Sequence, residues 1–129
     1  MRIYIAAPWI HREVAASWSF ALEVEGHSIS YKWWEHEGKG WEEDDEELAR
    51  QAENDIAGVL SADLMLLMNS LKSEGKAVEQ GVAIVRGIPI IAVGVRRGES
   101  LNVFHFLPNY TWVGSLEEAI GEINKRSVQ

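Results

Sequence analysis

Glu79 and Asp55 are the two side chains in this sequence best placed to do chemistry. Glu79 lies between Gly75 and Gly81, one turn into a segment of helical character that follows the apolar run at 64–68. Glycines there predict room for a ligand to approach the backbone and for a sheet to pack beneath it. Open α/β sheets bind small molecules where strand ends face helix starts, so an acid in this position indicates a functional site.

Asp55 supplies a second carboxyl group. It directly precedes Ile56, which is expected on the inner face of its helix, so we expect Asp55 near the edge of the core. Two carboxyl groups at one cleft suit cleavage of a glycosidic bond, in which one attacks the anomeric carbon and the other protonates the leaving group. That division needs one group ionised and the other protonated, which different surroundings provide. A solvated Glu79 and an exposed Asp55 are the alternatives.

Ser73 marks the start of the Glu79 helix. Its hydroxyl is suited to capping that helix beside free backbone amides, which together form an anion site. Lys72 and Lys76 add positive charge, although a plain capping serine fits the same pattern. Asp63 opens the preceding strand, where the favoured interpretation is an acid that caps a turn or pairs with a neighbouring loop.

Short apolar runs alternate along the chain with segments of helical periodicity. We expect strands at 2–7, 28–33, 63–68, 88–95 and 110–113, and helices at 11–25, 45–60, 75–86 and from Ser115 onward. The second helix is expected to bury a stripe of apolar residues, namely Leu48, Ala52, Ile56, Val59 and Leu60. Residues 34–41 are expected to form a mobile loop. The alternation predicts one α/β domain over residues 1–129, with a five-stranded parallel sheet and helices on both faces.

Composition narrows the classes of partner. The 129 residues fit one domain, and the net charge of −8 disfavours a nucleic acid polymer while leaving a single nucleotide open. No apolar run reaches the roughly 18 residues that span a membrane. The absence of cysteine excludes a disulfide framework and a thiolate site, so a cytoplasmic location is the default expectation. The four histidines lack metal-ligand spacing, and we expect no metal and no cofactor. The acidic run at 42–47 is expected to be a solvated helix start.

Three fragments, taken together, resemble the nucleoside 2-deoxyribosyltransferase superfamily, which includes the 2'-deoxynucleoside 5'-phosphate N-hydrolases. They are Ile3-Tyr4-Ile5-Ala6-Ala7-Pro8, then Asn54-Asp55 with Ala62-Asp63-Leu64, and finally Gly75-x3-Glu79-x-Gly81-x-Ala83 followed by Gly87-x-Pro89. Their order and spacing cover most of residues 2–95. The resemblance implies a flavodoxin-like (Rossmann-like) parallel sheet and a covalent deoxyribosyl intermediate.

The resemblance also implies roles for individual residues. Glu79 would be the nucleophile that attacks C1', Asp55 would assist protonation of the departing base, and Tyr4 would orient the nucleophile. Asp63 would be the structural acid that ends the Ala-Asp part of the pattern, and we count it among the site residues. Sites of this family are completed by a neighbouring subunit, and Asn102 falls where the donated polar residue would lie. We therefore expect a homodimer or a higher homo-oligomer.

One position separates the activities within the resemblance. Transferases of the family tend to carry an acid six residues before the nucleophile, where this chain has Ser73, as the nucleotide hydrolases tend to have. Gly75 belongs to the same helix start. The loop with Pro8, Trp9 and Arg12 is expected to help hold the phosphate, although it lacks the glycines typical of the hydrolases. Trp9, Trp33 and Trp34 are candidates for stacking on the base, and core packing explains each equally well.

The leading hypothesis is hydrolysis of the N-glycosidic bond of a 2'-deoxynucleoside 5'-monophosphate through a deoxyribosyl-Glu79 intermediate, with release of the free base. The first alternative is a deoxyribosyltransferase that passes the sugar to a second base. The second alternative is a nucleotide-binding module without catalysis.

Overall fold

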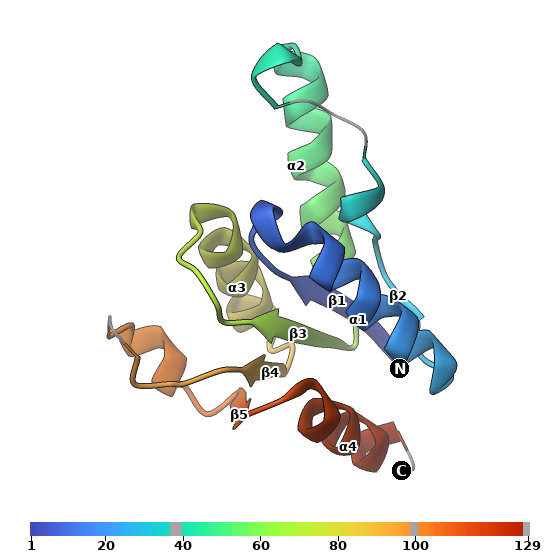
Figure 1. Ribbon diagram of the computed structural model, residues 1–129. Helices are drawn as coiled ribbons and strands as arrows, with labels where there is room; N and C mark the ends of the chain where they lie inside the picture. Colours follow the sequence, from blue (N-terminus) through green and yellow to red (C-terminus); the bar gives the residue numbers. More distant parts are fainter. Residues whose placement is uncertain (37–39, 99–100, 128–129) are drawn as a thin grey trace.

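A five-stranded parallel sheet forms the centre of the molecule in the computed structural model, which describes residues 1–36, 40–98 and 101–127 (Figure 1). The strands run in the order β2-β1-β3-β4-β5, the flavodoxin-like order. Their bounds are β1 Arg2–Ala6, β2 Ser28–Ile29, β3 Leu64–Met68, β4 Ile90–Val93 and β5 Tyr110–Val113. The main helices are α1 Arg12–Val24, α2 Asp45–Leu60, α3 Glu74–Arg86 and α4 Leu116–Ser127. Short 3-10 turns are η1 Trp9–His11, η2 Trp33–Glu35, η3 Gly40–Glu42 and η4 Val103–Phe106. The predicted α/β architecture is confirmed.

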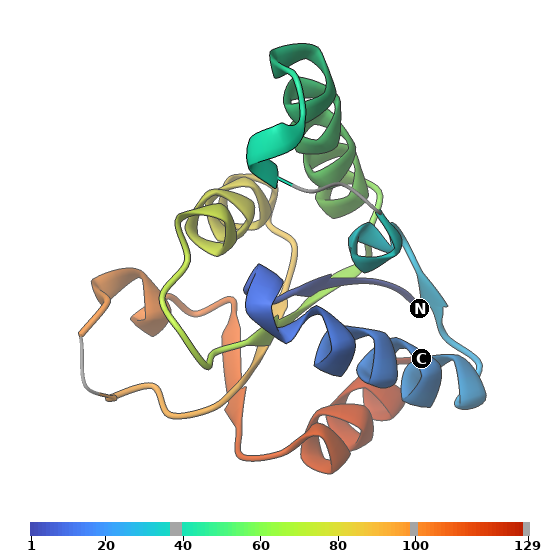
Figure 2. The same ribbon diagram turned by 45° about the horizontal axis from the view of Figure 1, so that its top comes forward.

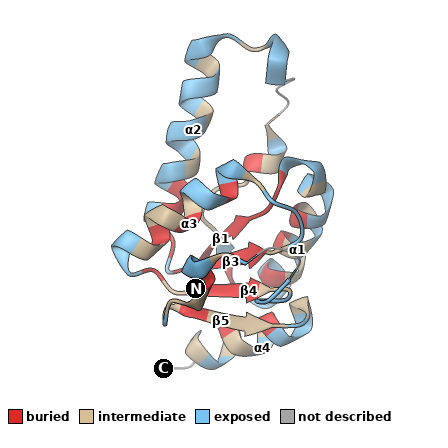
Figure 3. Ribbon diagram, turned by 90° about the vertical axis from the view of Figure 1, so that its left-hand side faces the viewer, coloured by how far each residue is buried: buried red, intermediate tan, exposed pale blue. Residues whose placement is uncertain are grey.

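Helices cover both faces of the sheet. α1 and α4 lie on one face, and α2 and α3 lie side by side on the other (Figures 1 and 2). β3 is buried along its whole length, because β1 and β4 flank it and helices cover it above and below (Figure 3). The strand order reverses between β1 and β3, and a crevice at such a point is where open sheets of this kind bind ligands.

The predicted strand at 28–33 is wrong beyond Ile29. Ser30 still donates its backbone N–H to the carbonyl of Ile3, but the chain then leaves the sheet and turns into η2. The reason is the indole of Trp33, which is buried and donates its Nε1–H to the carbonyl of Ile5 at 2.7 Å. A side chain thus replaces the backbone as the donor at this edge. Of the loop expected at 34–41, residues 37–39 lie outside the described residues.

The predicted inner stripe of α2 is also mostly wrong. Val59 is buried, whereas Leu48, Ala52, Ile56 and Leu60 are exposed. The amino-terminal half of α2 extends beyond the sheet, so its apolar positions have no strand beneath them (Figures 1 and 3).

Helix ends follow the predicted capping chemistry. Ser73 caps α3 by accepting from the backbone N–H of Lys76 at 3.3 Å, and Gly87 ends it with φ of +70°. Ser115 accepts from the N–H of Glu118, whose carboxylate in turn accepts from the N–H of Gly114. Among the described residues, no helix is long and apolar enough to span a membrane.

Candidate active site

The site is built around a hydrogen bond between Tyr4 and Glu79. Tyr4 lies in the middle of β1, fully buried, and its hydroxyl donates to Oε2 of Glu79 on α3 at 2.6 Å. Burial raises the pKa of Tyr4 far above its ordinary value, and the negative charges of Glu79 and Asp55 add to this effect. Tyr4 therefore stays a neutral phenol, and its proton is available to a carboxylate.

Gly58 makes room for the Tyr4 ring. A Cβ atom at Gly58 would lie 3.0 Å from ring carbons of Tyr4 and 2.8 Å from the Cβ of Tyr31, distances that side chains do not tolerate. α2 can therefore pack closely over β1 only because this position has no side chain. Sequence reasoning did not single out Gly58, although an isolated glycine inside a helical pattern is a signal of close packing.

Asp55 approaches the pair from α2. It is partly buried, and burial raises its pKa to about 6, while nearby His36 works against this shift. The ring of His36 is in turn held by Glu43, with His36 Nε2 2.8 Å from Glu43 Oε1. The negative charge of Asp55 acts on both Tyr4 and Glu79.

Glu79 holds its proton more tightly than Asp55 does. The pKa of Glu79 is raised to about 8, mainly by burial, and the charge of Asp55 acts in the same direction. The Tyr4 hydrogen bond and the ammonium of Lys76 act in the opposite direction. Two carboxyl groups with different surroundings and separated pKa values are the arrangement that acid–base chemistry requires.

Lys76 is a charged residue at the site whose burial the sequence did not predict. Only 4% of its surface is exposed, and its Nζ donates to the carbonyl of Met68, the last residue of β3, at 3.1 Å. Burial lowers the pKa of Lys76, and the charge of Glu79 opposes this shift. In the sequence Lys76 reads only as one of two lysines near a helix start.

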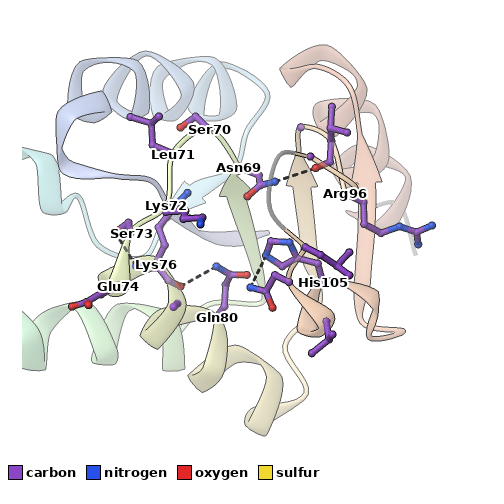
Figure 4. A pocket seen from close by; sticks show the side chains of 17 residues that line it. Asn69, Ser70, Leu71, Lys72, Ser73, Glu74, Lys76, Gln80, Arg96 and His105 are labelled. Atoms are coloured by element: carbon purple, nitrogen blue, oxygen red, sulfur yellow. Dashed lines mark hydrogen bonds between the residues drawn. The ribbon is translucent and has the colours of Figure 1, made fainter.

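A cavity of about 1200 Å³ opens beside the start of α3 (Figure 4). Ser73 and, on α3, Lys76 and Gln80 line one side, and His105 of η4 lies opposite. Asn102 also lines the cavity. Glu79 does not line this cavity, whereas Lys76 contributes to it and also acts on Glu79. The cavity therefore adjoins the carboxyl pair through Lys76.

The expected tight packing at two glycines is not found. A Cβ atom at Gly75 would meet only Ser73 Oγ at 3.7 Å, and one at Gly81 would have no neighbour within 4 Å in the described structure. Gly75 lies at the first turn of α3 and leaves the adjacent amides accessible, but neither glycine is required by a neighbouring element.

The loop after β1 contributes an aromatic cluster. Pro8 is buried, and Trp9 is 48% exposed, with the guanidinium of Arg12 4.9 Å from its ring centre. Trp9 lies 6.1 Å from Trp33, and Trp33 lies 5.4 Å from Trp34, measured between ring centres. Trp33 serves the core, whereas Trp9 retains a free face.

Asp63 and Asn102 do not join the Tyr4–Glu79 pair. Asp63 lies just before β3, where its Oδ2 accepts from the N–H of Arg2 at 2.8 Å. This is the amino-terminal edge of the sheet, about 17 Å from the carboxyl end of β3 at 3.3 Å per residue. The contact fits the structural role implied by the resemblance rather than substrate contact. Asn102 caps η4 by accepting from the N–H of Phe104 at 3.0 Å.

No group of residues suited to a metal ion occurs in the part of the chain that the structure describes.

Comparison with solved structures reveals close likeness in fold. A 2-deoxyribosyltransferase from Bacillus psychrosaccharolyticus matches with a TM-score of 0.70 and 18% identity, over 93% of this chain and 90% of that one. The chain has the 2-deoxyribosyltransferase fold. A CMP N-glycosidase from Clostridium botulinum shares this fold, with a TM-score of 0.60 and 16% identity, over 97% of this chain and 99% of that one.

A conserved protein from Enterococcus faecalis V583 also matches this chain in fold, with a TM-score of 0.66 and 19% identity over 98% of both chains. No protein-family model and no curated protein sequence matches this chain. At these identities the likeness establishes the fold, so the resemblance seen in the sequence is confirmed at that level.

Proposed function

We propose that this protein is an enzyme that cleaves the N-glycosidic bond of a 2'-deoxynucleoside 5'-monophosphate. The observation that carries the proposal is the hydrogen bond between Tyr4 of β1 and Glu79 of α3, with the charge of Asp55 of α2 acting on both. Solved structures with the same fold include a deoxyribosyltransferase and an N-glycosidase that acts on CMP, and both support N-glycosidic chemistry here.

The reaction proceeds in two displacements. The carboxylate of Glu79 attacks C1' of the sugar, the C1'–N bond breaks with its electron pair going to the base, and Asp55 donates a proton to that base. Asp55, now ionised, then takes a proton from water, whose oxygen attacks C1' and releases Glu79. The products are the free base and 2-deoxyribose 5-phosphate, with retained configuration at C1'. Tyr4 holds the Glu79 carboxylate in position throughout.

Ser73 and the start of α3 are the proposed phosphate site. The Ser73 hydroxyl accepts from Lys76 N–H, and its own proton remains available to a phosphate oxygen. The free backbone N–H groups of Gly75 and of the first turn of α3 can donate to an anion, and the positive end of the helix dipole favours negative charge at the same place. Trp9 in η1 and Arg12 at the start of α1 follow β1, and we propose that they help hold the base and the phosphate.

The test is incubation with each deoxynucleoside and deoxynucleotide, with and without a free acceptor base, followed by chromatography for the released base. Glu79→Gln abolishes turnover if the proposal holds, and Asp55→Asn slows poor leaving groups more than activated ones. Folding of both variants is checked by circular dichroism. Wild-type turnover by a folded Glu79→Gln protein contradicts the mechanism, and absence of turnover by wild type on every substrate supports the non-catalytic alternative.

A base-exchanging transferase is the second candidate, because the deoxyribosyltransferase structure matches with the higher TM-score, 0.70 against 0.60. Ser73→Asp separates the two. An acid there repels a phosphate dianion, so the variant should lose kcat/KM for nucleotides about tenfold or more while sparing free nucleosides. Wild-type preference for the free nucleoside, with transfer to the added base, favours the transferase.

We further propose a homodimer in which Asn102 completes the partner's site. Apolar side chains are exposed on α2, α3 and around η4, as expected of an interface: Leu48, Ile56, Leu60, Val78, Val85, Leu101, Val103 and Phe104. Mixing inactive Asn102→Ala and Glu79→Gln chains restores about a quarter of wild-type activity if the residue acts across the dimer. No recovery on mixing means that Asn102 acts within its own chain, and a fully active monomer by light scattering excludes the dimer.

A further inference from the structure

Lys76 is buried between the carboxyl pair and the cavity. It precedes Glu79 by three residues on α3, so the two side chains lie on the same face of the helix. Its ammonium carries three donors, and among the described residues its one hydrogen-bond acceptor is the carbonyl of Met68 at 3.1 Å. A cation so nearly excluded from water needs a negative partner, and the carboxylate that acts on it is Glu79.

Three groups act on Glu79, one each from β1, α2 and α3. Tyr4 comes from β1 as a neutral donor, Asp55 comes from α2 as a negative charge, and Lys76 comes from α3 itself. Tyr31 acts on Tyr4, and His36 acts on Asp55. Lys76 is thus the positive charge that acts on Glu79 within the described structure.

We propose that Lys76 is a positioning residue that holds the negative charge on Glu79 and so leaves the shared proton on Asp55. The inference rests on the proposed function, in which Glu79 attacks as a carboxylate and Asp55 donates a proton. Lys76 itself touches neither the base nor C1' in this scheme. It sets which of the two carboxyl groups is ionised.

The need for such a residue follows from the order in which the two groups ionise. The pKa is about 6 for Asp55 and about 8 for Glu79, so Asp55 loses its proton first in the free protein. The singly protonated form that carries its charge on Glu79 is therefore the less populated of the two. A nearby opposite charge lowers a carboxyl pKa by about one unit or more. Without Lys76, the productive form would fall at least about tenfold further.

The direct test is titration of Glu79 by NMR of ¹³C-labelled glutamate side chains, assigned with Glu79→Gln. Lys76→Met and Lys76→Gln remove the charge and keep most of the buried stem, and Lys76→Arg restores the charge. Lys72→Met removes an exposed lysine at the edge of the same cavity as a matched control. We expect the Glu79 midpoint to rise by about one unit or more in both uncharged variants. It should stay near the wild-type value in Lys76→Arg and in Lys72→Met.

Turnover gives a second measurement with a different signature. In Lys76→Met the maximum of kcat/KM falls about tenfold, and the alkaline limb of the pH profile moves upward with the Glu79 midpoint. A merely structural lysine would lower the maximum without moving the limb. An unchanged or lowered Glu79 midpoint in folded Lys76→Met and Lys76→Gln overturns the inference, while loss of activity in Glu79→Gln would still support the proposed function. Full activity of Glu79→Gln overturns the proposed function, while the titration still reports on Lys76.

Discussion

Replacing Tyr4 with phenylalanine removes one oxygen atom from the centre of the site. The ring of phenylalanine fills the same space against Gly58, so the packing of α2 over β1 is kept. What is lost is the 2.6 Å hydrogen bond to Glu79 Oε2, which favours the ionised form of Glu79. A hydrogen bond to a charged group contributes about 1.5–3 kcal/mol. At 1.36 kcal/mol per unit, its loss raises the pKa of Glu79 by about one to two units.

The consequence for turnover follows from the sign of that shift. Raising the pKa of Glu79 from about 8 depletes the attacking carboxylate at every pH below the new value. The maximum of kcat/KM should therefore fall by about ten- to 150-fold. The alkaline limb of the pH profile should move upward by about one to two units at the same time.

The assay is base release by chromatography between pH 5 and 10, beside NMR titration of Glu79. Tyr110→Phe is the matched control, because Tyr110 also donates a buried hydroxyl at 2.6 Å, but to Gln80 rather than to Glu79. It should leave the Glu79 midpoint in place. An unchanged alkaline limb in Tyr4→Phe, with the protein folded, would refute the reasoning that the Tyr4 hydroxyl supports the carboxylate.

Three further changes test the physical basis of the fold and site. Glu79 has a higher pKa in the folded protein than its ordinary 4.5, so wild-type stability is full below pH 4.5 and falls up to about pH 8. Glu79→Gln should therefore have a higher Tm than wild type above pH 4.5, corresponding to a gain of up to about 5 kcal/mol in free energy of unfolding at pH 8 and above. No gain at pH 9 would argue against a buried carboxyl group. Gly58→Ala should displace Tyr4, lower the free energy of unfolding in urea by about 1–3 kcal/mol and reduce activity. Wild-type stability and activity of this variant would show that α2 can shift to make room for the added methyl group. Trp33→Phe should cost about 1–3 kcal/mol because the carbonyl of Ile5 loses its buried donor, and wild-type stability would mean that water replaces the indole.

The fold followed from the sequence wherever local pattern and final environment agree. The run at 64–68 is apolar on both faces because it becomes the central strand β3, and Gly87 ends α3 as its type predicts. The pattern failed where a distant partner decides the structure. Trp33 leaves the expected strand for the carbonyl of Ile5, 28 residues away, and four of the five expected inner positions of α2 are exposed.

The candidate site, like the fold, could be predicted from the sequence only in part. Glu79, Asp55 and Tyr4 were identified from residue type and from the resemblance, and the structure brings all three together. Gly58 and Lys76 were missed in these roles, because a glycine within a helix does not name its packing partner and a lysine near a helix start gives no sign of burial. The importance of Gly58 depends on a ring from β1, and that of Lys76 depends on being 4% exposed next to a carboxylate.

The depth at which Glu79 lies links stability to reactivity. Burial is the main cause of its raised pKa, so the ionised form costs the folded protein free energy at neutral pH. The same burial removes water from the carboxylate, and a poorly hydrated carboxylate at a sugar carbon is a stronger nucleophile. Tyr4 and Lys76 return part of the lost stabilisation without restoring water. Removing either should therefore slow the reaction by depleting the carboxylate, whereas exposing Glu79 to solvent should lower its pKa and still slow the reaction.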